Sequence, residues 1–374
     1  MKFTSSLPPP LQDEYKHSLI LSKKIVEKIN KKKGAITFQQ FMQMALYEPQ
    51  LGYYVAGKHK IGSKGDFITA PEISNLYSFC LAQQAAAILK HFSQPVILEL
   101  GAGRGQMAAD ILLHLAHLQQ LPKYYYILEV SPDLRQQQAD TIYKYVPDLI
   151  DRIVWLDCLP ATPIAIEGVI VANEVLDAMP VELFTLVNGE RVTRHVLWKD
   201  DHFEFDAVEG DYTSEFNPAI PAWMQSLADS LASGAILLID YGYEANDYYH
   251  PERNQGTLIC HYQHHVHDNP LIYPGLQDIT ASVDFTAVAN AGIEAGLELA
   301  GYTTQAEFLI NSGLEDLFIQ ALNENPQAQY KLAQQVRMLT LPSEMGERFK
   351  VMAFSKNFTQ PLSGFKIGDR RHRL

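Results

Sequence analysis

The stretch that decides the fold is Leu98-Glu99-Leu100-Gly101-Ala102-Gly103-Arg104-Gly105, which continues an apolar run from residue 95. A glycine turn at the end of a strand lets the backbone approach a ligand, and the following helix offers free N–H groups. A dinucleotide fingerprint reads GxGxxG, but Gln106 follows Gly105 and the spacing here is GxGxG. Glu99 would repel a pyrophosphate and suits a ligand that carries an ammonium and a sulfonium. The loop therefore disfavours a nicotinamide dehydrogenase.

Short apolar runs alternate with helical patterns after this stretch. The runs are YYYILEV (124–130), RIVWLD (152–157), EGVIVANE (167–174) and GAILLIDYG (234–242). Strands that are apolar along their whole length indicate a parallel sheet covered by helices on both faces. We therefore predict an α/β, Rossmann-like, doubly wound sheet, in which ligands collect at the carboxyl ends of the strands. Those ends read Glu99, Glu129, Asp157, Asn173 and Asp240.

Two further acids extend the cofactor assignment. Glu129 lies 24 residues beyond Gly105, where an acid accepts both hydroxyls of a ribose. Asp157 ends the third run, where an acid can take an adenine amino group. Together with the loop they describe S-adenosylmethionine as the cofactor. The residues predicted to bind it are Glu99, Gly101, Gly103, Gly105, Glu129 and Asp157.

The rest of the chain is expected to form a cap. Residues 1–90 read as helical and irregular, with Thr37 as the N-cap of a helix and Gln40 at its third position. Residues 91–374 carry the sheet, with insertions at about 184–215 and 243–300 that we expect to contribute to a substrate-side cap. The first insertion contains Asn188-Gly189, a strong hairpin signal.

Composition excludes several classes. The 374 residues are 47% hydrophobic, which is enough for a sizeable core, and the net charge of −13 provides no basic field for nucleic acid. Cys80, Cys158 and Cys260 form no CxxC, which argues against a disulfide framework or a cysteine zinc site. No apolar run reaches the roughly 18 residues that span a bilayer, and the N-terminus lacks a signal-peptide core. We expect a cytoplasmic protein without a nucleic-acid partner or membrane span.

Several motifs together resemble one family. They are GDFITAPEIS (65–74), ILELGAGRG, LEVSPDL, VIVANEVLDAMPVELF, LLIDYG, GLQDITASVDF and MGERFKVM, in order from about residue 35 to 355. They are similar to the MidA family of class I S-adenosylmethionine-dependent methyltransferases, which includes the mitochondrial methyltransferase that assists assembly of respiratory complex I. The resemblance implies a class I methyltransferase fold with a family-specific cap. It also implies a protein arginine as acceptor in the mitochondrial members, hence a basic protein partner such as a respiratory-complex subunit. No mitochondrial presequence is evident, so the chain looks like a bacterial member.

The catalytic candidates lie at the end of the fourth strand. Methyl transfer is an in-line displacement, so positioning and electrostatics supply most of the rate. A guanidinium acceptor needs carboxylates to orient it and a group to take its proton. Asn173, Glu174 and Asp177 in VANEVLDAMP are those candidates, and the Asn173 carbonyl can also hold the cofactor's amino group. Glu174 could instead be a helix-start carboxylate facing the helix dipole. Base-specific amino-methyltransferases carry Asn/Asp-Pro-Pro-aromatic here, and this chain does not.

The motif GDFITAPEIS has a structural and a functional interpretation. In the structural one, Thr69 caps a helix that begins at Pro71, with Glu72 in the first turn. In the functional one, supported mainly by the family resemblance, the loop folds over the cofactor. Thr69 is then a cofactor residue, Glu72 a catalytic candidate and Asp66 a substrate-binding candidate.

The second insertion contains the pattern HxxHHxHD at residues 261–268. It lacks a second ligand cluster, so we predict no metal site. His265 is instead a candidate for the substrate cleft. Asp278 and Asp284 in QDITASVDF match the family and are candidates for the same cleft, although Asp278 followed by Thr280 is also typical of a turn.

The favoured function is an S-adenosylmethionine-dependent methyltransferase that acts on a protein arginine. A small-molecule methyltransferase remains open, because an acidic cleft also accepts a cationic metabolite. A non-catalytic assembly or scaffold protein that retains the cofactor pocket is the alternative outside the enzymes.

Overall fold

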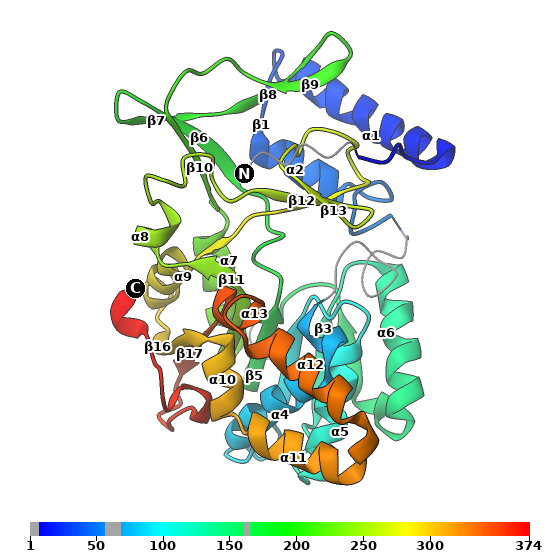
Figure 1. Cartoon of the computed structure of the whole chain (residues 1–374), viewed down its shortest axis with the longest axis vertical. Helices are drawn as coiled ribbons and strands as arrows, with labels where there is room; N and C mark the ends of the chain where they lie inside the picture. Colours follow the sequence, from blue (N-terminus) through cyan, green and yellow to red (C-terminus); the bar gives the residue numbers. More distant parts are fainter. Residues whose placement is uncertain (1–6, 57–68, 161–164) are drawn as a thin grey trace. The chain divides into compact units, whose positions relative to one another are not determined.

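The computed structural model describes residues 7–56, 69–160 and 165–374. The chain forms two compact units (Figure 1). The first comprises Met1–Phe67, Leu176–Ala219 and Ala245–Asp284, and the second comprises Ile68–Val175, Ile220–Glu244 and Phe285–Leu374. Each unit therefore contains segments that are far apart in the sequence.

The second unit is built on one twisted sheet with the strand order β16-β17-β11-β5-β2-β3-β4. Neighbouring strands from β11 to β4 run parallel, whereas β17 is antiparallel to both β11 and β16. The chain order reverses between β2 and β5, and such a switch point creates a crevice at the carboxyl ends of the strands. The predicted doubly wound α/β sheet is confirmed. The strands are β2 Val96–Leu100, β3 Tyr124–Leu128, β4 Ile153–Leu156, β5 Ile166–Asn173, β11 Leu231–Tyr243, β16 Glu298–Thr304 and β17 Phe349–Lys356.

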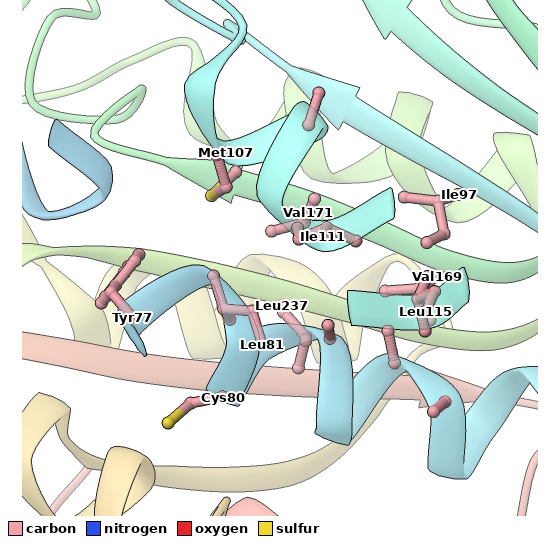
Figure 2. Close-up of a cluster of buried hydrophobic side chains, with 14 of the residues drawn as sticks. Tyr77, Cys80, Leu81, Ile97, Met107, Ile111, Leu115, Val169, Val171 and Leu237 are labelled. Atoms are coloured by element: carbon pink, nitrogen blue, oxygen red, sulfur yellow. The ribbon is translucent and has the colours of Figure 1, made fainter. Parts of the chain in front are cut away.

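Helices cover this sheet because its strands are apolar on both faces. One face packs against α4 and α5, through a buried cluster that includes Leu81, Ile111, Leu115 and Val169 (Figure 2). This packing holds the N-terminal end of α5 at the carboxyl edge of the sheet. The helices are α3 Ala70–Ile73, α4 Asn75–Leu89, α5 Gln106–His117, α6 Pro132–Tyr145, α7 Ile220–Ser230, α9 Phe285–Glu294, α10 Gln305–Asn311, α11 Leu314–Glu324, α12 Gln329–Thr340 and α13 Met345–Arg348. Short 3₁₀ turns cover Pro147–Arg152, Pro326–Ala328, Ser363–Phe365 and Arg371–Arg373.

The first unit combines helices with small antiparallel sheets. Its strand orders are β1-β8-β9, β10-β6-β7 and β13-β12-β14. Its core joins Leu21 and Ile25 of α1 to Phe38 and Phe41 of α2. The elements are α1 Gln12–Lys31, β1 Ile36–Thr37, α2 Phe38–Tyr47, β6 Glu182–Val187, β7 Glu190–Thr193, β8 His195–Lys199, β9 His202–Phe205, β10 Tyr212–Phe216, α8 Ala245–Tyr248, β12 Ile259–Tyr262, β13 His265–His267, β14 Asp278–Thr280 and β15 Val283–Asp284.

Two local predictions in this unit are confirmed. The Thr37 hydroxyl accepts a hydrogen bond from the Gln40 backbone N–H at 3.3 Å, so Thr37 caps α2. The hairpin turn at Asn188-Gly189 joins β6 to β7, with Val187 opposite Glu190. Both residues of the turn have positive φ, 53° and 83°, as a two-residue hairpin turn requires.

The unit boundaries differ from the expected domain limits. Residues 68–90 contain α3 and α4, which belong to the second unit with the sheet rather than to an N-terminal region. Likewise α9 and the start of β16 fall within the expected 243–300 insertion but belong to the second unit. The reason is packing, because Phe285 and Val288 of α9 are completely buried. The substrate-side cap stays a prediction for the first unit.

Two features of the structure bear on disulfide formation and membrane insertion: the state of the cysteines and the character of the helices. Cys80 and Cys260 are buried thiols and Cys158 is an exposed one, and none is in a disulfide. Within the described ranges, no helix combines the length and apolarity needed to cross a membrane.

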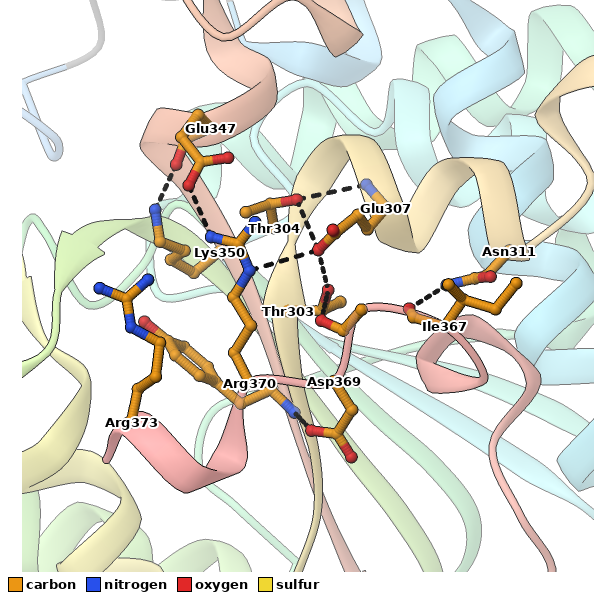
Figure 3. A network of polar contacts seen from close by, with 12 residues as sticks. Thr303, Thr304, Glu307, Asn311, Glu347, Lys350, Ile367, Asp369, Arg370 and Arg373 are labelled. Atoms are coloured by element: carbon orange, nitrogen blue, oxygen red, sulfur yellow. Dashed lines mark hydrogen bonds and ion pairs between the residues drawn. The ribbon is translucent and has the colours of Figure 1, made fainter.

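The basic C-terminal tail is neutralised by acids of its own unit (Figure 3). The Arg370 guanidinium donates to Glu347 Oε1 at 2.6 Å and lies 3.4 Å from Glu307 Oε2. The Arg370 backbone N–H donates to the Tyr302 carbonyl at 2.6 Å, which ties the tail to β16. Thr303 adds a hydroxyl donor to Glu307 at 2.7 Å. The tail is therefore a structural clasp and not a free cationic segment.

Replacing Arg370 with Met should lower stability by about 1 kcal/mol, or a few degrees in Tm, because two carboxylates lose a charge-assisted partner. Thermal unfolding measured by circular dichroism at low and at 0.5 M salt checks this, and the loss should shrink at high salt. Lys366→Met is the matched control, since Lys366 is an exposed cation of the same tail. Equal Tm values for the two variants would show that the clasp contributes nothing.

Candidate active site

The Gly101–Gly105 loop leaves β2 in a backbone conformation that suits glycine alone. Gly101, Gly103 and Gly105 have φ of 64°, 51° and 83°. A Cβ on Gly105 would lie 2.9 Å from the Cα of Gln138, so a side chain there would displace backbone of α6. The Gly105 N–H donates to the Ala102 carbonyl at 2.8 Å. The loop is thus compact, and α5 begins directly after it at the carboxyl edge of the sheet.

Glu99 is a buried carboxyl just before this loop. It is 1% exposed, and the Tyr125 hydroxyl donates to its Oε2 at 2.6 Å. Burial raises the pKa of Glu99 to about 7, although the hydrogen bond from Tyr125 acts in the opposite direction. A cationic ligand would favour the charged form of this group, as the sequence predicts for a cofactor with an ammonium and a sulfonium.

Glu129 follows β3 at the same edge and is held at both oxygens. Its Oε1 accepts from the Ser131 backbone N–H at 2.8 Å, and its Oε2 accepts from the Gln138 amide at 3.2 Å. Burial raises the pKa of Glu129, while these hydrogen bonds and nearby Arg135 act in the opposite direction. A carboxylate oxygen has two acceptor positions, so capacity remains for the hydroxyls of a ribose.

Asp157 lies at the end of β4 but has a different environment. Its side chain is 91% exposed, and the Arg135 guanidinium contacts it at 2.6 Å. The same guanidinium donates to the carbonyls of Glu129 and Leu156 and so joins the ends of β3 and β4. Recognition of the adenine amino group by Asp157 stays a prediction.

Asn173 is the last residue of β5 and Glu174 follows it. Together with Tyr77 of α4 they form a chain of hydrogen bonds that all run in one direction. The Tyr77 hydroxyl donates to Asn173 Oδ1, and Asn173 Nδ2 donates to Glu174 Oε1 at 3.1 Å. Glu174 has a φ of 53°, which is strained for a residue with a side chain, and its N–H donates to the Ile239 carbonyl at 2.9 Å. Such strain persists where surrounding structure enforces it, often at functional sites. Burial, and next the charge of Glu174, raise the pKa of Tyr77, so its hydroxyl stays a donor.

The GDFITAPEIS segment (65–74) is only partly described, because Asp66 lies outside the described residues. The helix begins at Ala70 and not at Pro71, and Thr69 is its N-cap residue. Thr69 is thus at the predicted N-cap position, but its side chain makes no capping hydrogen bond. Glu72 lies in the first turn, close enough to raise the pKa of Asp110 on α5. Burial is the main cause of that rise, to about 6.

In the first unit, Asp177 and Asp278 gather around Tyr54. The Tyr54 hydroxyl donates to Asp278 Oδ1 at 2.7 Å. Burial, then Asp278, and more weakly Asp177, raise the pKa of this tyrosine well above its usual range. The Asp177 carbonyl accepts from the Ala281 N–H at 3.0 Å. Two acids that are far apart in the sequence thus lie within electrostatic reach of one tyrosine.

Asp284 and His265 of the first unit have other surroundings. Burial and then Asp284 raise the pKa of Tyr249. His265 is exposed at a hairpin end, and its Nδ1 lies 2.7 Å from the Gln263 carbonyl. Among the described residues, no group of three or more His, Cys, Asp or Glu is arranged to hold a metal ion.

Sequence reasoning missed Tyr77, Asp110 and Gln138. Tyr77 lies in NLYSF, which is typical of an apolar helix face, and Gln138 ends a run of three glutamines typical of a helix surface. Tyr77 contacts Asn173, and Gln138 contacts Gly103 and Glu129, so these contacts bridge separate elements and no short motif signals them.

The residues at the carboxyl edge of β2, β3 and β5 fit S-adenosylmethionine. The glycine loop gives close backbone approach, Glu129 supplies fixed acceptors for a ribose, and buried Glu99 favours a nearby cation. When bound, this cofactor supplies a methyl group on a positively charged sulfur, which a nucleophile can attack.

Solved structures support this fit. The chain has 39% identity and a TM-score of 0.94 to a methyl transferase candidate from Burkholderia thailandensis bound to S-adenosyl-homocysteine, with 99% of this chain and 100% of that chain covered. A second Burkholderia thailandensis structure has the same identity and coverage and a TM-score of 0.91. The cofactor is therefore S-adenosylmethionine, whose demethylated product is the ligand in the first of these structures.

Curated relatives cover most of the chain at lower identity. The protein arginine methyltransferase NDUFAF7 of Danio rerio is 28% identical over 399 residues, with 89% of each chain covered. The protein of the same name from Homo sapiens is 28% identical over 376 residues, with 86% of this chain and 80% of its own covered.

Glu99→Gln should stabilise the protein and weaken its binding of the ligand. The native carboxyl keeps its proton up to about pH 7, whereas the unfolded one loses it near pH 4.5, so stability from Glu99 falls as the pH rises between these values. The variant should therefore gain up to about 3 kcal/mol at pH 8 and little at pH 4.5. Its affinity for S-adenosylhomocysteine at pH 8 should fall about tenfold or more. Thermal unfolding and calorimetric titration measure the two effects.

The pH dependence separates this from general damage. Wild-type affinity for S-adenosylhomocysteine should fall as the pH drops below about 7, and Glu99→Gln should lack this dependence. Tyr125→Phe, which removes the donor to Glu99, should move the midpoint to higher pH. If Glu99→Gln binds as tightly as wild type at pH 8, Glu99 does not hold the ligand's cation.

The family model gives the broader assignment. A model of S-adenosyl-L-methionine-dependent methyltransferases matches residues 80–303, more than half of the chain, and this range contains the glycine loop, Glu99, Glu129, Asn173 and Glu174. Sheet topology, loop geometry and the solved relatives agree with it. The protein belongs to this family of class I S-adenosylmethionine-dependent methyltransferases, as the resemblance of its motifs predicted.

Proposed function

We propose that the protein transfers the methyl group of S-adenosylmethionine to an arginine side chain of a basic protein. The observation that carries this is the Glu174 carboxylate, directed by Asn173 and held in a left-handed backbone at the end of β5. A guanidinium is recognised best by fixed carboxylates, which accept two of its N–H groups at once. The protein arginine methyltransferases that cover most of the chain at 28% identity support the same acceptor.

The chemistry assigns Glu174 two tasks. The guanidinium has to be oriented so that one nitrogen faces the methyl carbon, and a carboxylate at its other N–H groups does this. The new C–N bond forms as the C–S bond breaks, and the attacking nitrogen then loses one proton, so that the methylated guanidinium keeps a single positive charge. We assign this proton to the Glu174 carboxylate, or to water next to it. Asn173 donates to one oxygen of this carboxylate and so directs it.

The remaining predicted residues belong to substrate recognition in this proposal. Asp177, previously a catalytic candidate, Asp278 and Asp284 are acids of the first unit that suit a positively charged polypeptide. Glu72 stays a catalytic candidate, and Thr69 a cofactor one, near the start of the second unit. The net charge of −13 also favours a basic partner, which by family resemblance includes subunits of respiratory complexes. The scattered free cysteines suit a reducing compartment such as the cytoplasm.

Transfer of labelled methyl from S-adenosylmethionine tests the acceptor. The purified protein is incubated with a cell extract separated into polypeptides and small molecules, and labelled peptides are mapped by mass spectrometry. Monomethyl- or dimethylarginine in specific proteins supports the proposal. Label confined to the small-molecule fraction makes the protein a small-molecule methyltransferase. Tight binding of S-adenosylhomocysteine without transfer to either fraction favours the scaffold alternative.

Glu174→Gln should separate catalysis from cofactor binding. Affinity for S-adenosylhomocysteine should stay within about twofold of wild type, whereas methyl transfer should fall about 100-fold or more, since the variant cannot accept the proton or pair with the guanidinium. The control is Glu167→Gln, which changes an exposed acid at the other end of the same strand. Unchanged turnover in Glu174→Gln would remove Glu174 from the catalytic residues.

A further inference from the structure

Gln138 of α6 makes three hydrogen bonds while completely buried. Its amide nitrogen donates to the Gly103 carbonyl at 3.0 Å and to Glu129 Oε2 at 3.2 Å. Its amide oxygen accepts from the Trp155 indole N–H at 2.9 Å. Both N–H groups and the carbonyl of this side chain are therefore engaged, each with a different part of the chain.

Trp155 determines which way the amide faces. The two ends of a glutamine amide have nearly the same shape, so only the hydrogen-bond partners distinguish them. The indole N–H is a donor and cannot accept, so the amide oxygen has to face it. The NH₂ group then faces two acceptors, the Gly103 carbonyl and the Glu129 carboxylate. A reversed amide would place its oxygen against both of these acceptors.

Gln138 thus connects the two features that define the cofactor site. Gly103 belongs to the loop after β2, and Glu129 follows β3. The α6 backbone also lies close to the loop. A Cβ added to Gly105 would be only 2.9 Å from the Gln138 Cα. Ser131 fixes the other oxygen of Glu129, so its carboxylate has little freedom to rotate. The separation between loop and carboxylate therefore depends on one buried amide.

We propose that Gln138 is a positioning residue that gives the site its selectivity for a ribose, by holding the Glu129 carboxylate at a set distance from the glycine loop, with Trp155 orienting its amide. The ligand class is a ribonucleoside with both ring hydroxyls present. The inference depends on the cofactor and is independent of the methyl acceptor.

Calorimetric titration with S-adenosylhomocysteine and with its 2′-deoxyribose analogue tests the proposal. Wild type should prefer the ribose form. Gln138→Met keeps the length of the side chain and removes its hydrogen bonds. It should therefore lower the affinity for S-adenosylhomocysteine about 5- to 30-fold and the affinity for the deoxy analogue much less. Gln136→Met is the matched control, because Gln136 is an exposed glutamine of the same helix that contacts Asp140.

Three outcomes overturn the proposal. These are unchanged affinity in Gln138→Met, an equal loss for both ligands, and an equal loss in Gln136→Met. An equal loss for both ligands would make Gln138 a general packing residue.

Two further variants keep the test decisive if Gln138→Met unfolds. Trp155→Phe removes only the orienting donor and should reduce the preference for ribose by a smaller factor, with Tm measured alongside. In a Glu129→Gln background, the preference for ribose should already be small, and Gln138→Met should not reduce it further. Additive effects of the two substitutions on this preference contradict a role that acts through Glu129.

Discussion

The turn from β2 into α5 is the constraint on which the active site depends. Three alternate residues have left-handed backbone there, and a side chain on Gly105 would collide with the backbone of α6. Only glycine meets both conditions without strain. Because β2 is central in the sheet and next to the switch point, this turn brings the backbone to the edge where β3 and β5 also end. The acids at those ends can then face a common ligand.

Ionisation of the two acids at this edge, Glu99 and Glu129, is unfavourable in the folded protein. Burial raises the pKa of both Glu99 and Glu129, which means that the folded protein resists their ionisation. Glu129 has Arg135 nearby, which lowers its pKa, whereas the donor that opposes the effect of burial at Glu99 is the neutral Tyr125 hydroxyl. A cationic ligand next to these acids would make their ionisation less unfavourable, so ligand binding and stability would be linked through the same groups. The arrangement is typical of sites in which function is retained against the optimum for stability.

Features determined by neighbouring residues could be predicted from the sequence. The ends of the strands, the Thr37 cap and the Asn188-Gly189 turn depend on residues within a few positions of one another. Tyr77 could not be found in this way, because its partner Asn173 is 96 residues away and nothing in NLYSF marks a buried hydroxyl. The end of the second insertion, expected at about residue 300, is not a unit boundary. Instead α9 and β16 belong to the unit that contains the sheet, through buried contacts that no local pattern reveals.

Two hydrogen-bond chains of the same kind direct the carboxylates of the site. Tyr77 donates to the Asn173 oxygen, and the Asn173 amide donates to Glu174. Trp155 donates to the Gln138 oxygen, and the Gln138 amide donates to Glu129.

In each chain the first group donates to the oxygen of the amide. An indole cannot accept, and burial keeps the Tyr77 phenol protonated by raising its pKa. The carboxylate beyond each amide accepts from its N–H group, so the amide nitrogen has to face the carboxylate and the amide oxygen has to face the phenol or the indole. An apolar side chain of the same size would fill the same space but remove the amide donor to each carboxylate. Buried amides at these two positions therefore give two carboxylates fixed directions for hydrogen bonding, Glu129 as the proposed ribose acid and Glu174 as the proposed catalytic acid.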